Sequence, residues 1–389
     1  MSDAILTLNA GSSSIKLAVF DLAPGGGLSC WRRGELREAG AAQRFRLRDA
    51  GGRTIAEETW QAEGFETSLS QLMARIGDEL AGRRLAGIGH RVVHGGAGHR
   101  VPERVTPDLL ALLEELADLA PLHVPHNLAP IRAIAGQLPD VPQVVCFDTA
   151  FHHTMAPVAR RFALPREYED RGIRRYGFHG LSYEFVARQL AALSPRMHAG
   201  RTIAAHLGSG ASICAMRGGA SVDTTMGFTA LDGLVMGTRC GALDPGALLH
   251  VMRQDGLDVE AAERLLYTRS GLLGLSGVSN DMQVLLGSGE ASAGEAVDVF
   301  VYRIVREAGA LASVLGGLDG FVFTAGIGEN APEIRKRVCE RLGWLGVDLD
   351  GEANRRGAAV ISTPESRVEV RVVATDEEAM IAEHVRDLP

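Results

Sequence analysis

Apolar and polar residues occur in short blocks along the N-terminal part of the chain, and the first two apolar blocks predict a β-hairpin. Residues 5–8 and 15–20 are mostly apolar runs of strand length, and the turn between them, residues 9–14, holds only small or polar side chains. Short apolar runs bounded by Gly, Ser and Asn are typical of strands. The same pattern predicts further strands at the following positions: 28–36, 45–47 and 54–60, with turns at 24–27 and 49–52.

A second hairpin of the same design is predicted near the middle of the chain. Residues 203–206 and 213–216 are apolar, and a turn rich in Gly and Ser separates them. Because this turn joins two strands, it fits neither a dinucleotide fingerprint nor a Walker A loop. Residues without bulk let backbone N–H groups converge on a phosphate, although an ordinary tight turn is the alternative for one hairpin alone. The repetition predicts a duplicated domain with a phosphate clamp between the two copies.

A third Gly-rich segment, residues 324–330, follows a predicted strand at 320–323 and precedes a helix beginning near Pro332. We expect it to be a loop that opens a helix, with its N–H groups facing a nucleotide. Three Gly-rich turns that can each bind phosphate are hard to explain as ordinary tight turns. The sequence therefore predicts a ligand that carries phosphate groups.

Helical periodicity of apolar residues predicts the helices. They are expected at 67–80, 106–119, 247–254, 293–315 and 377–385, with a Pro-punctuated loop at 121–127. The last helix follows a predicted strand at 368–374, and Thr375 and Glu378 have the spacing of a capping box. Glu377 is thereby placed in the first turn, where a carboxylate that merely complements the helix dipole is the alternative.

Two charged residues stand next to predicted strand ends, where α/β sheets bind ligands. Arg91 follows a predicted strand at 85–88 and is flanked by Val92 and Val93. A surface guanidinium is the more common state of Arg, but a charge among apolar residues usually binds a carboxylate or a phosphate. Asp148 follows the predicted strand 141–147, and a ligand-binding carboxylate or an ordinary capping Asp explains it equally well.

Other charged residues give weaker signals when each is taken alone. His179 stands between an aromatic residue and a glycine, and a lone His is more often structural than catalytic. Arg239 belongs to a Gly-rich segment, 221–241, that is too irregular for a helix or strand. We interpret a group of arginines in the N-terminal strands as a solvated sheet face rather than an anion site: Arg32, Arg33, Arg37, Arg44, Arg46 and Arg48.

Composition fits a cytoplasmic enzyme with two domains. A chain of 389 residues exceeds what one hydrophobic core usually supports. The net charge of −8 gives no reason to expect nucleic acid as a partner. The five cysteines lack metal-ligand spacing, which favours reduced thiols in a reducing compartment. We expect no membrane association, because there is neither a signal segment nor an apolar run of spanning length.

Taken together, the motifs closely resemble those of the acetate kinase family. They cover nearly the whole chain, in family order and spacing: residues 9–16, 89–96, 147–152, 175–180, 206–212, 221–245, 325–330 and 375–380. The resemblance implies an α/β fold of two duplicated ribonuclease-H-like (actin-like ATPase) domains that flank an interdomain cleft. The first is expected to comprise residues 1–150, completed by a helix at 377–389. The second is expected at 151–376, with the nucleotide site and the interface of a homodimer.

The family's activity is reversible phosphoryl transfer from ATP to acetate, which gives acetyl phosphate and ADP. By resemblance, Arg91 and Arg239 hold the acetate carboxylate and the transferring phosphoryl group, and His179 donates to a phosphoryl oxygen. Acetate is already ionised at neutral pH and needs no general base. We therefore interpret Asp148 as orienting Mg²⁺, a bound water or an arginine, although the family is often described with an acid/base aspartate there.

The resemblance also implies the binding residues. The metal-binding residues are Asn9 and Glu377, and the metal is Mg²⁺ or Mn²⁺ in its place. Those of the phosphate cradle are Asn9, Ser12, Ser14 and Lys16. Those for ATP or ADP are His206, Leu207, Gly208, Ser209, Gly210, Asp281, Met282, Gln283, Gly326, Ile327, Gly328, Glu329 and Asn330. Those of the acyl pocket are Val93, Leu122, Phe178 and Ala230.

Several positions depart from the family pattern. Ser209 stands where the family has Asn, Gln283 stands where it has Arg, and Ala230 stands where it has Pro. The segment 180–183 reads Gly-Leu-Ser-Tyr in place of Gly-Thr-Ser-His. These changes imply an altered nucleotide affinity, and the smaller residue at 230 leaves room for propionate. A propionate or short-chain carboxylate kinase is one alternative. A nucleotide-binding relative without turnover is another, while a chaperone or filament ATPase is disfavoured by the arginine pair.

Overall fold

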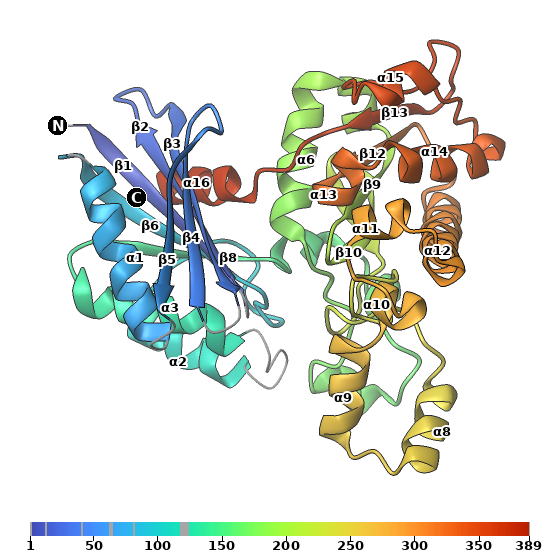
Figure 1. Cartoon of the computed structure of the whole chain (residues 1–389), viewed down its shortest axis with the longest axis horizontal. Helices are drawn as coiled ribbons and strands as arrows, with labels where there is room; N and C mark the ends of the chain where they lie inside the picture. The colour runs from blue at the N-terminus through green and yellow to red at the C-terminus, as the bar shows by residue number, and fades with distance from the viewer. Residues whose placement is uncertain are drawn as a thin grey trace. The chain divides into compact units, whose positions relative to one another are not determined.

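The computed structural model describes residues 2–11, 14–39, 42–61, 65–80, 82–116 and 124–388. The chain divides into two compact units. Unit 1 comprises Met1–Ala150 and Asp376–Pro389, and unit 2 comprises Phe151–Thr375. Each unit contains one β-sheet with helices packed on it (Figure 1). The α/β class expected from the sequence is therefore confirmed.

The sheet of unit 1 begins with the predicted N-terminal hairpin. Its strands are β1 (Asp3–Ala10), β2 (Ser14–Leu22), β3 (Leu28–Ala39), β4 (Ala42–Asp49), β5 (Thr54–Gln61), β6 (Arg84–Val92), β7 (Glu103–Arg104) and β8 (Gln143–Phe147). They are ordered β5-β4-β3-β2-β1-β6-β8-β7. The five strands from β1 to β5 form an antiparallel meander, and β6 and β8 add to β1 in parallel. The carboxyl ends of β1, β6 and β8 therefore meet at one edge of the sheet.

Helices cover the two faces of this sheet differently. They are α1 (Phe65–Leu80), α2 (Pro107–Glu115), α3 (Val124–Gln137) and α16 (Glu377–Asp387). Leu69, Leu72 and Ile76 of α1 form one buried cluster with alternate residues of β1, β2 and β4. The C-terminal helix α16 packs on β6 and β1. It contacts the other face, because Gly87 and Gly89 of β6 lie beneath its side chains.

Glycine on β6 allows this close approach of α16. A Cβ at Gly87 would lie 2.7 Å from Val385, and one at Gly89 would overlap both Ile381 and Val385. Since no side chain larger than hydrogen fits there, the helix rests directly on the strand. Glu377, the first residue of α16, is held in unit 1 by this contact.

Unit 2 repeats the core of unit 1. Its strands are β9 (Arg201–Leu207), β10 (Ala211–Arg217), β11 (Ala220–Thr224), β12 (Gly320–Thr324) and β13 (Glu369–Val372). They are ordered β11-β10-β9-β12-β13, with three antiparallel strands followed by two parallel additions. The order β3-β2-β1-β6-β8 in unit 1 has the same connectivity and directions. This repetition confirms the duplicated ribonuclease-H-like fold.

Some helices of unit 2 pack on its sheet, and others lie away from the strands (Figure 1). They are α4 (Pro157–Arg160), α5 (Arg166–Asp170), α6 (Gly180–Leu193), α7 (Pro195–Ala199), α8 (Pro245–Asp255), α9 (Val259–Thr268), α10 (Gly271–Ser276), α11 (Met282–Gly287), α12 (Ala291–Leu315), α13 (Ala325–Asn330), α14 (Pro332–Arg341) and α15 (Gly351–Arg355). The long helix α12 buries Phe300, Ile304 and Leu311, as its periodicity predicts. None of the helices in the described ranges is long and apolar enough to span a bilayer.

Four local predictions need correction. The segment 325–330 is itself the short helix α13 rather than a loop. Asn127 belongs to α3 rather than to a Pro-punctuated loop, because proline is tolerated in the first turn of a helix. Asp376 rather than Thr375 caps α16, since its carboxylate accepts from Ala379 N–H. The helix expected to reach residue 119 ends at Glu115, and residues 117–119 lie outside the described ranges.

The packing of α16 on glycine can be tested with a matched pair of alanine substitutions. Gly89→Ala is expected to destabilise the protein by about 1–3 kcal/mol, because its methyl group overlaps Ile381. Gly136→Ala, in a helix with open space around the position, is expected to be neutral or stabilising. Urea unfolding followed by circular dichroism measures both. Equal effects of the two substitutions would show that α16 does not rest on β6.

Candidate active site

Four of the predicted residues meet in unit 1 at the carboxyl ends of β1, β6 and β8. Arg91 donates from one guanidinium nitrogen to Asp148 Oδ2 at 2.5 Å and from the other to Asn9 Oδ1 at 3.2 Å. Asn9 Nδ2 donates in turn to Glu377 Oε2 at 3.2 Å. Asp148 is fully buried, and the Arg91 side chain is 17% exposed. The chain of contacts therefore runs from the buried Asp148 carboxylate through the Arg91 guanidinium and the Asn9 amide to the Glu377 carboxylate.

Burial and charge perturb this cluster. Burial raises the pKa of Glu377 from its ordinary 4.5 to about 7, and the negative charges of Asp148 and Glu378 add to the shift. Arg91 and Lys16 act in the opposite direction. Burial disfavours the charged form of Arg91, but Asp148 and Glu377 outweigh it and raise its pKa. The cluster thus holds more carboxylate charge than its cations balance, which favours the binding of a further cation.

Asn127, which the sequence did not single out as a site residue, ties the ends of two strands together. Its Oδ1 accepts from Val93 N–H at 2.9 Å, and its Nδ2 donates to Ala10 C=O at 2.6 Å. The side chain is buried and joins the end of β6 to the end of β1. Asn127 therefore fixes the spacing between Asn9, which precedes Ala10, and Arg91, which stands two residues before Val93.

The remaining predicted residues of unit 1 lie around this cluster. Lys16 pairs with Asn9 across the hairpin, so both side chains lie on one face of the sheet. Ser14 closes the turn by accepting from Gly11 N–H at 2.8 Å through its carbonyl oxygen. Val93 is buried directly after β6. Ser12 of the phosphate cradle and Leu122 of the acyl pocket lie outside the described residues.

In unit 2, two predicted cationic or donor groups converge above the turn of the second hairpin. A Cβ at Gly210 would lie 2.7 Å from an Arg239 guanidinium nitrogen and 3.2 Å from His179 Nε2. Arg239 also donates to Ala230 C=O at 2.6 Å, which anchors the guanidinium from its other side. The structure therefore brings Arg239, His179 and Gly210 together. Glycine at this position leaves the space beneath the two side chains.

Backbone strain and a hydroxyl pair position His179. Its backbone is left-handed, with φ of 59°, which is uncommon for a residue other than glycine. Nδ1 lies 2.8 Å from Ser212 Oγ, and Ser212 in turn lies 2.5 Å from the Tyr183 hydroxyl. These contacts direct the other ring nitrogen, Nε2, toward Gly210. Strained residues of this kind cluster at functional sites.

His206 supports His179 from one side. The two rings stack with centroids 4.0 Å apart and an angle of 12° between their planes. His206 Nδ1 lies 2.8 Å from Ser182 Oγ, which also accepts from the Thr375 hydroxyl at 2.8 Å. Thr375 is therefore part of a hydrogen-bonded chain that leads to His206, which explains why it does not cap α16.

The predicted nucleotide residues fall into two groups beside the second hairpin. A Cβ at Gly208 would lie 3.7 Å from the Ala325 methyl group, so the hairpin turn is close to the start of α13. Gly237 N–H donates to Ser209 C=O at 3.0 Å, and Gly237 also lies beside Asn280. Through Asn280, the predicted residues 281–283 are placed near the same turn. Leu207 is buried at the end of β9.

Within these two groups the side chains have distinct surroundings. The Asp281 carboxylate caps α11 by accepting from Gln283 N–H at 2.8 Å, and Met282 is buried while Gln283 is exposed. In α13, Asn330 donates to Gly326 C=O at 2.9 Å. Glu329 accepts from Thr375 N–H at 3.1 Å. The side chains of Asp281, Glu329 and Asn330 therefore each form a hydrogen bond with a backbone group of unit 2.

Arg335, also missed as a site residue, fixes the end of α13. It is 1% exposed and donates to Gly328 C=O at 3.0 Å and to Glu329 C=O at 2.7 Å. Two further bonds, both 2.8 Å long, join it to Asn354. Burial lowers its pKa. A sequence signal existed, since Arg335 stands between buried Ile334 and Val338, but most of its partner atoms are backbone carbonyl oxygens, which the sequence pattern does not reveal.

The acyl-pocket residues of unit 2 are held through contacts of their backbone carbonyl oxygens. Phe178 is buried, and its carbonyl oxygen lies 2.9 Å from His152 Nε2. His152 is buried too, with Nδ1 at 2.8 Å from Ser221 Oγ. Ala230 is half-buried and presents its carbonyl oxygen to Arg239. Any change of backbone at residue 230 therefore acts on Arg239 as well.

The donor set in unit 1 fits a magnesium ion. Mg²⁺ prefers hard oxygen ligands and is commonly held by one or two carboxylates together with substrate phosphates and water. Glu377 offers a carboxylate whose ionisation is opposed by its surroundings, so a divalent cation stabilises the charged form. No described group of three or more His, Cys, Asp or Glu residues forms a closed metal site. An ion held by Glu377 and Asn9 would therefore take the rest of its ligands from substrate and water.

The repeated sheets, each with a small-residue turn next to its parallel strands, define a protein of the actin-like ATPase fold class. The sequence profile of the acetokinase family matches residues 4–383. The chain therefore belongs to the acetokinase family.

Individual relatives agree with this family. Acetate kinase of Rhodopseudomonas palustris is 50% identical over 393 residues, which cover 99% of this chain and 98% of the relative. The crystal structure of Porphyromonas gingivalis acetate kinase matches with a TM-score of 0.87 at 36% identity. A propionate kinase from Francisella tularensis matches with a TM-score of 0.90 at 34% identity. Each structural match covers 98% of both chains.

The raised pKa of Glu377 predicts a pH-dependent stability. A carboxyl group that binds its proton more tightly in the folded state loses stabilisation as pH rises from about 4.5 to about 7. In buffer with EDTA, Glu377→Gln is therefore expected to raise the melting temperature relative to wild type at pH 8. At pH 5, where Glu377 is protonated, the advantage is expected to disappear.

Glu340→Gln provides the control for this comparison, because Glu340 is an exposed carboxylate in unit 2. It is expected to change the melting temperature equally little at both pH values. Adding MgCl₂ at pH 8 is expected to stabilise wild type more than Glu377→Gln, since a ligand of the folded state raises its stability. An effect of Glu377→Gln that is the same at pH 5 and pH 8 would contradict the assignment.

Proposed function

We propose that this protein transfers the γ-phosphoryl group of ATP to acetate, reversibly, and forms acetyl phosphate and ADP. Membership of the acetokinase family supports the reaction. The convergence of Arg239 and His179 above the Gly210 turn is the observation that carries it, because these groups suit a phosphoryl group that gains charge during transfer. The reaction needs no nucleophilic side chain, because the acetate oxygen itself attacks phosphorus.

The chemistry makes charge neutralisation the main task of the protein. Acetate is ionised at neutral pH, so its oxygen attacks phosphorus without losing a proton. A bond forms between this oxygen and the γ-phosphorus while the bond from phosphorus to the ADP oxygen breaks. Both reactants are anions, and cations must hold them in line. Arg91, Arg239 and Lys16 are the cations that we assign to this task.

We assign His179 to the transferring phosphoryl group. Its Nε2 faces Gly210 while Nδ1 lies against Ser212, so we assign Nε2 to donate a hydrogen bond to an equatorial oxygen. The Ser212 contact and the stacked ring of His206 restrict rotation of the imidazole. A donor held in place before the reaction costs no reorganisation in the transition state.

We assign Asp148 to the positioning of Arg91 rather than to proton transfer. The carboxylate is fully buried and accepts a hydrogen bond from the guanidinium at 2.5 Å. Asn9 and Glu377 would hold Mg²⁺, which neutralises phosphate charge when it is bound. Ser12, Ser14 and Lys16 complete the phosphate cradle in this proposal.

The ATP and ADP contacts are assigned to the turn and helices of unit 2. They comprise His206, Leu207, Gly208, Ser209, Gly210, Asp281, Met282, Gln283, Gly326, Ile327, Gly328, Glu329 and Asn330. Support comes from the packing of Gly208 against Ala325 and of Gly237 against Ser209 and Asn280, which gathers the segments. Ser209 and Gln283 stand where the family has Asn and Arg, so we expect weaker nucleotide binding than in relatives that keep them.

Propionate is the second candidate substrate. Ala230 is smaller than the family's proline, and a propionate kinase from Francisella tularensis matches with a TM-score of 0.90, although its 34% identity is below the 50% of the Rhodopseudomonas palustris acetate kinase. One methylene group shifts discrimination by only about 10–200-fold. Val93, Leu122, Phe178 and Ala230 are the residues that we assign to the acyl group.

We also propose that the protein is a cytoplasmic homodimer that associates through unit 2. The five cysteines are free thiols, which suits a reducing compartment. The family resemblance supports the dimer. We propose neither nucleic acid nor a membrane as a partner of this protein.

An assay with hydroxylamine tests the reaction directly, because hydroxylamine converts an acyl phosphate to a hydroxamate. Purified protein with MgATP is expected to form hydroxamate from acetate at least as fast as from propionate or butyrate. His179→Ala and Arg239→Ala are each expected to lower kcat by about 10²–10³-fold, since each removes a donor to the transition state. Arg253→Ala, an exposed residue of α8, serves as the control and is expected to retain activity.

Three outcomes of this assay are informative. A clear preference for propionate would favour the second candidate. No hydroxamate from any acid, with ATP binding intact, would overturn the kinase assignment and indicate a nucleotide-binding relative without turnover. Full activity in both His179→Ala and Arg239→Ala would leave the reaction standing but reject the site.

A further inference from the structure

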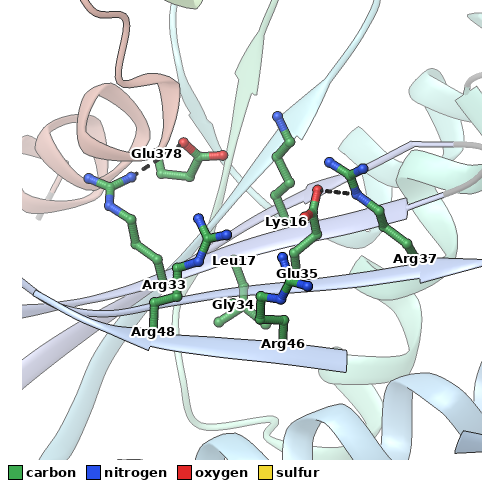
Figure 2. A pocket seen from close by; sticks show the side chains of 9 residues that line it. All are labelled: Lys16, Leu17, Arg33, Gly34, Glu35, Arg37, Arg46, Arg48 and Glu378. Carbon is green, nitrogen blue, oxygen red and sulfur yellow. Dashed lines mark ion pairs between the residues drawn. The ribbon is translucent and has the colours of Figure 1, made fainter. Parts of the chain in front are cut away.

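A cavity of about 280 Å³ opens on the sheet of unit 1 and includes Lys16, which we also assign to the phosphate cradle. Its lining comes from three adjacent strands and from α16 (Figure 2). The lining residues are Lys16, Leu17, Arg33, Gly34, Glu35, Arg37, Arg46, Arg48 and Glu378. Five of them are cations and two are carboxylates, in a chain whose net charge is −8. The charge of the cavity is therefore opposite to that of the whole protein.

Strand register explains why these cations lie on one face. Lys16 of β2 stands opposite Glu35 of β3, which stands opposite Arg46 of β4. Arg33 stands directly opposite Arg48. Residues paired across adjacent strands point to the same side of a sheet, and like charges directly opposite destabilise it. The arrangement therefore carries a cost that a bound anion would remove.

Arg32 does not belong to this group, which corrects the prediction of a single arginine-rich face. It points to the opposite side of the sheet and pairs with Glu79 of α1 at 2.8 Å. Because side chains alternate along a strand, Arg32 and Arg33 cannot share a face. The other five arginines lie on the solvated face that the sequence predicts, where four of them line the cavity and Arg44 lies beside it without lining it.

The carboxylates around the cavity leave part of its positive charge unbalanced. Arg33 pairs with Asp376 and lies 3.7 Å from Glu378, and Arg37 pairs with Glu35 at 2.7 Å. Figure 2 shows the ion pairs of Arg33 with Glu378 and of Arg37 with Glu35. It also shows that the Arg46 and Arg48 guanidinium groups point to the same side as Lys16.

Three donor groups are left for a ligand. Lys16 and Arg48 form no ion pair with any residue in the described part of the chain. Arg46 pairs with Glu57 at 3.1 Å, but its Nε is buried and has no acceptor among the described residues. A buried donor without an acceptor costs free energy, so an acceptor supplied by a ligand is favoured.

We propose that this cavity binds a small multivalent oxyanion, a phosphate compound or a polycarboxylate with at least two negative charges. Guanidinium groups match the oxygen geometry of both classes and bind them with two parallel hydrogen bonds. The volume is at the lower end for ligand sites, which suits a small anion rather than a polymer. The ligand contacts Lys16, Arg46 and Arg48.

Isothermal titration calorimetry with two probes tests the proposal. Inorganic pyrophosphate and citrate are titrated into the full-length protein at constant ionic strength in EDTA, because surface charges are screened by salt. The double variant Arg46→Gln/Arg48→Gln is expected to bind the preferred probe at least tenfold more weakly than wild type. Tighter binding of pyrophosphate would assign the site to phosphate compounds, and tighter binding of citrate would assign it to polycarboxylates.

Arg44→Gln is the matched control. Arg44 lies on the same strand and face and pairs with the same carboxylate, Glu57, but it does not line the cavity. It is expected to keep the wild-type affinity. Equal weakening in Arg44→Gln and the double variant would show a general charge effect and overturn the cavity as a site. Unchanged binding in the double variant, or no binding of either probe to wild type, would overturn it too.

A second variant covers the case in which the double glutamine variant does not fold. Arg46→Lys/Arg48→Lys keeps both positive charges but removes the planar guanidinium groups that form two parallel hydrogen bonds. This variant is therefore expected to bind the preferred probe several-fold more weakly than wild type. Wild-type affinity in this variant would reject the bidentate contacts. Because binding is measured without ATP or acetate, the result does not depend on the proposed transfer reaction.

Discussion

The contact between Arg91 and Asp148 is the interaction on which the candidate site of unit 1 depends. Asp148 is fully buried, and a buried carboxylate is stable only when a partner compensates its charge. Arg91 provides that partner and at the same time donates to Asn9, which donates to Glu377. Loss of either charge would leave the other uncompensated. The geometry of Asn9 and Glu377 therefore follows from this one pair.

The repeated fold explains why the candidate residues occur in two sets. In each unit the first hairpin turn lies next to the carboxyl ends of the parallel strands, where α/β sheets bind ligands. In unit 1 this edge gathers Asn9, Arg91 and Asp148. In unit 2 the equivalent turn holds Gly210 beneath Arg239 and His179. Duplication thus provides two related edges, and different side chains adapt them to different parts of the proposed reaction.

Much of the fold could be predicted from the sequence, because it rests on local pattern. Both hairpins, the meander strands and the long helix α12 follow from runs and periods of apolar residues, and the structure confirms them. Errors occurred where a distant contact overrides the local signal. Thr375 has the spacing of a helix cap, but its hydroxyl bonds to Ser182 instead.

The candidate site was less accessible to sequence reasoning. Arg91, Asp148, His179 and Arg239 could be selected by type and position, and their roles stay predictions. The residues that hold them were missed, because Asn127 and Arg335 act through partners that are remote in sequence or are backbone atoms. The pairing of Ser212 with His179 has the same character. A cavity lined by arginines likewise depends on strand register, which composition does not reveal.

The central claim is that the site works by placing charge and not by removing a proton, and Asp148→Asn tests it most directly. If Asp148 only positions Arg91, the variant should raise KM for acetate more than it lowers kcat, and the pH dependence of kcat should keep its shape. If Asp148 were a general base, kcat would fall by about 10²–10⁴-fold and the acidic limb of its pH profile would disappear. The second result would contradict the account.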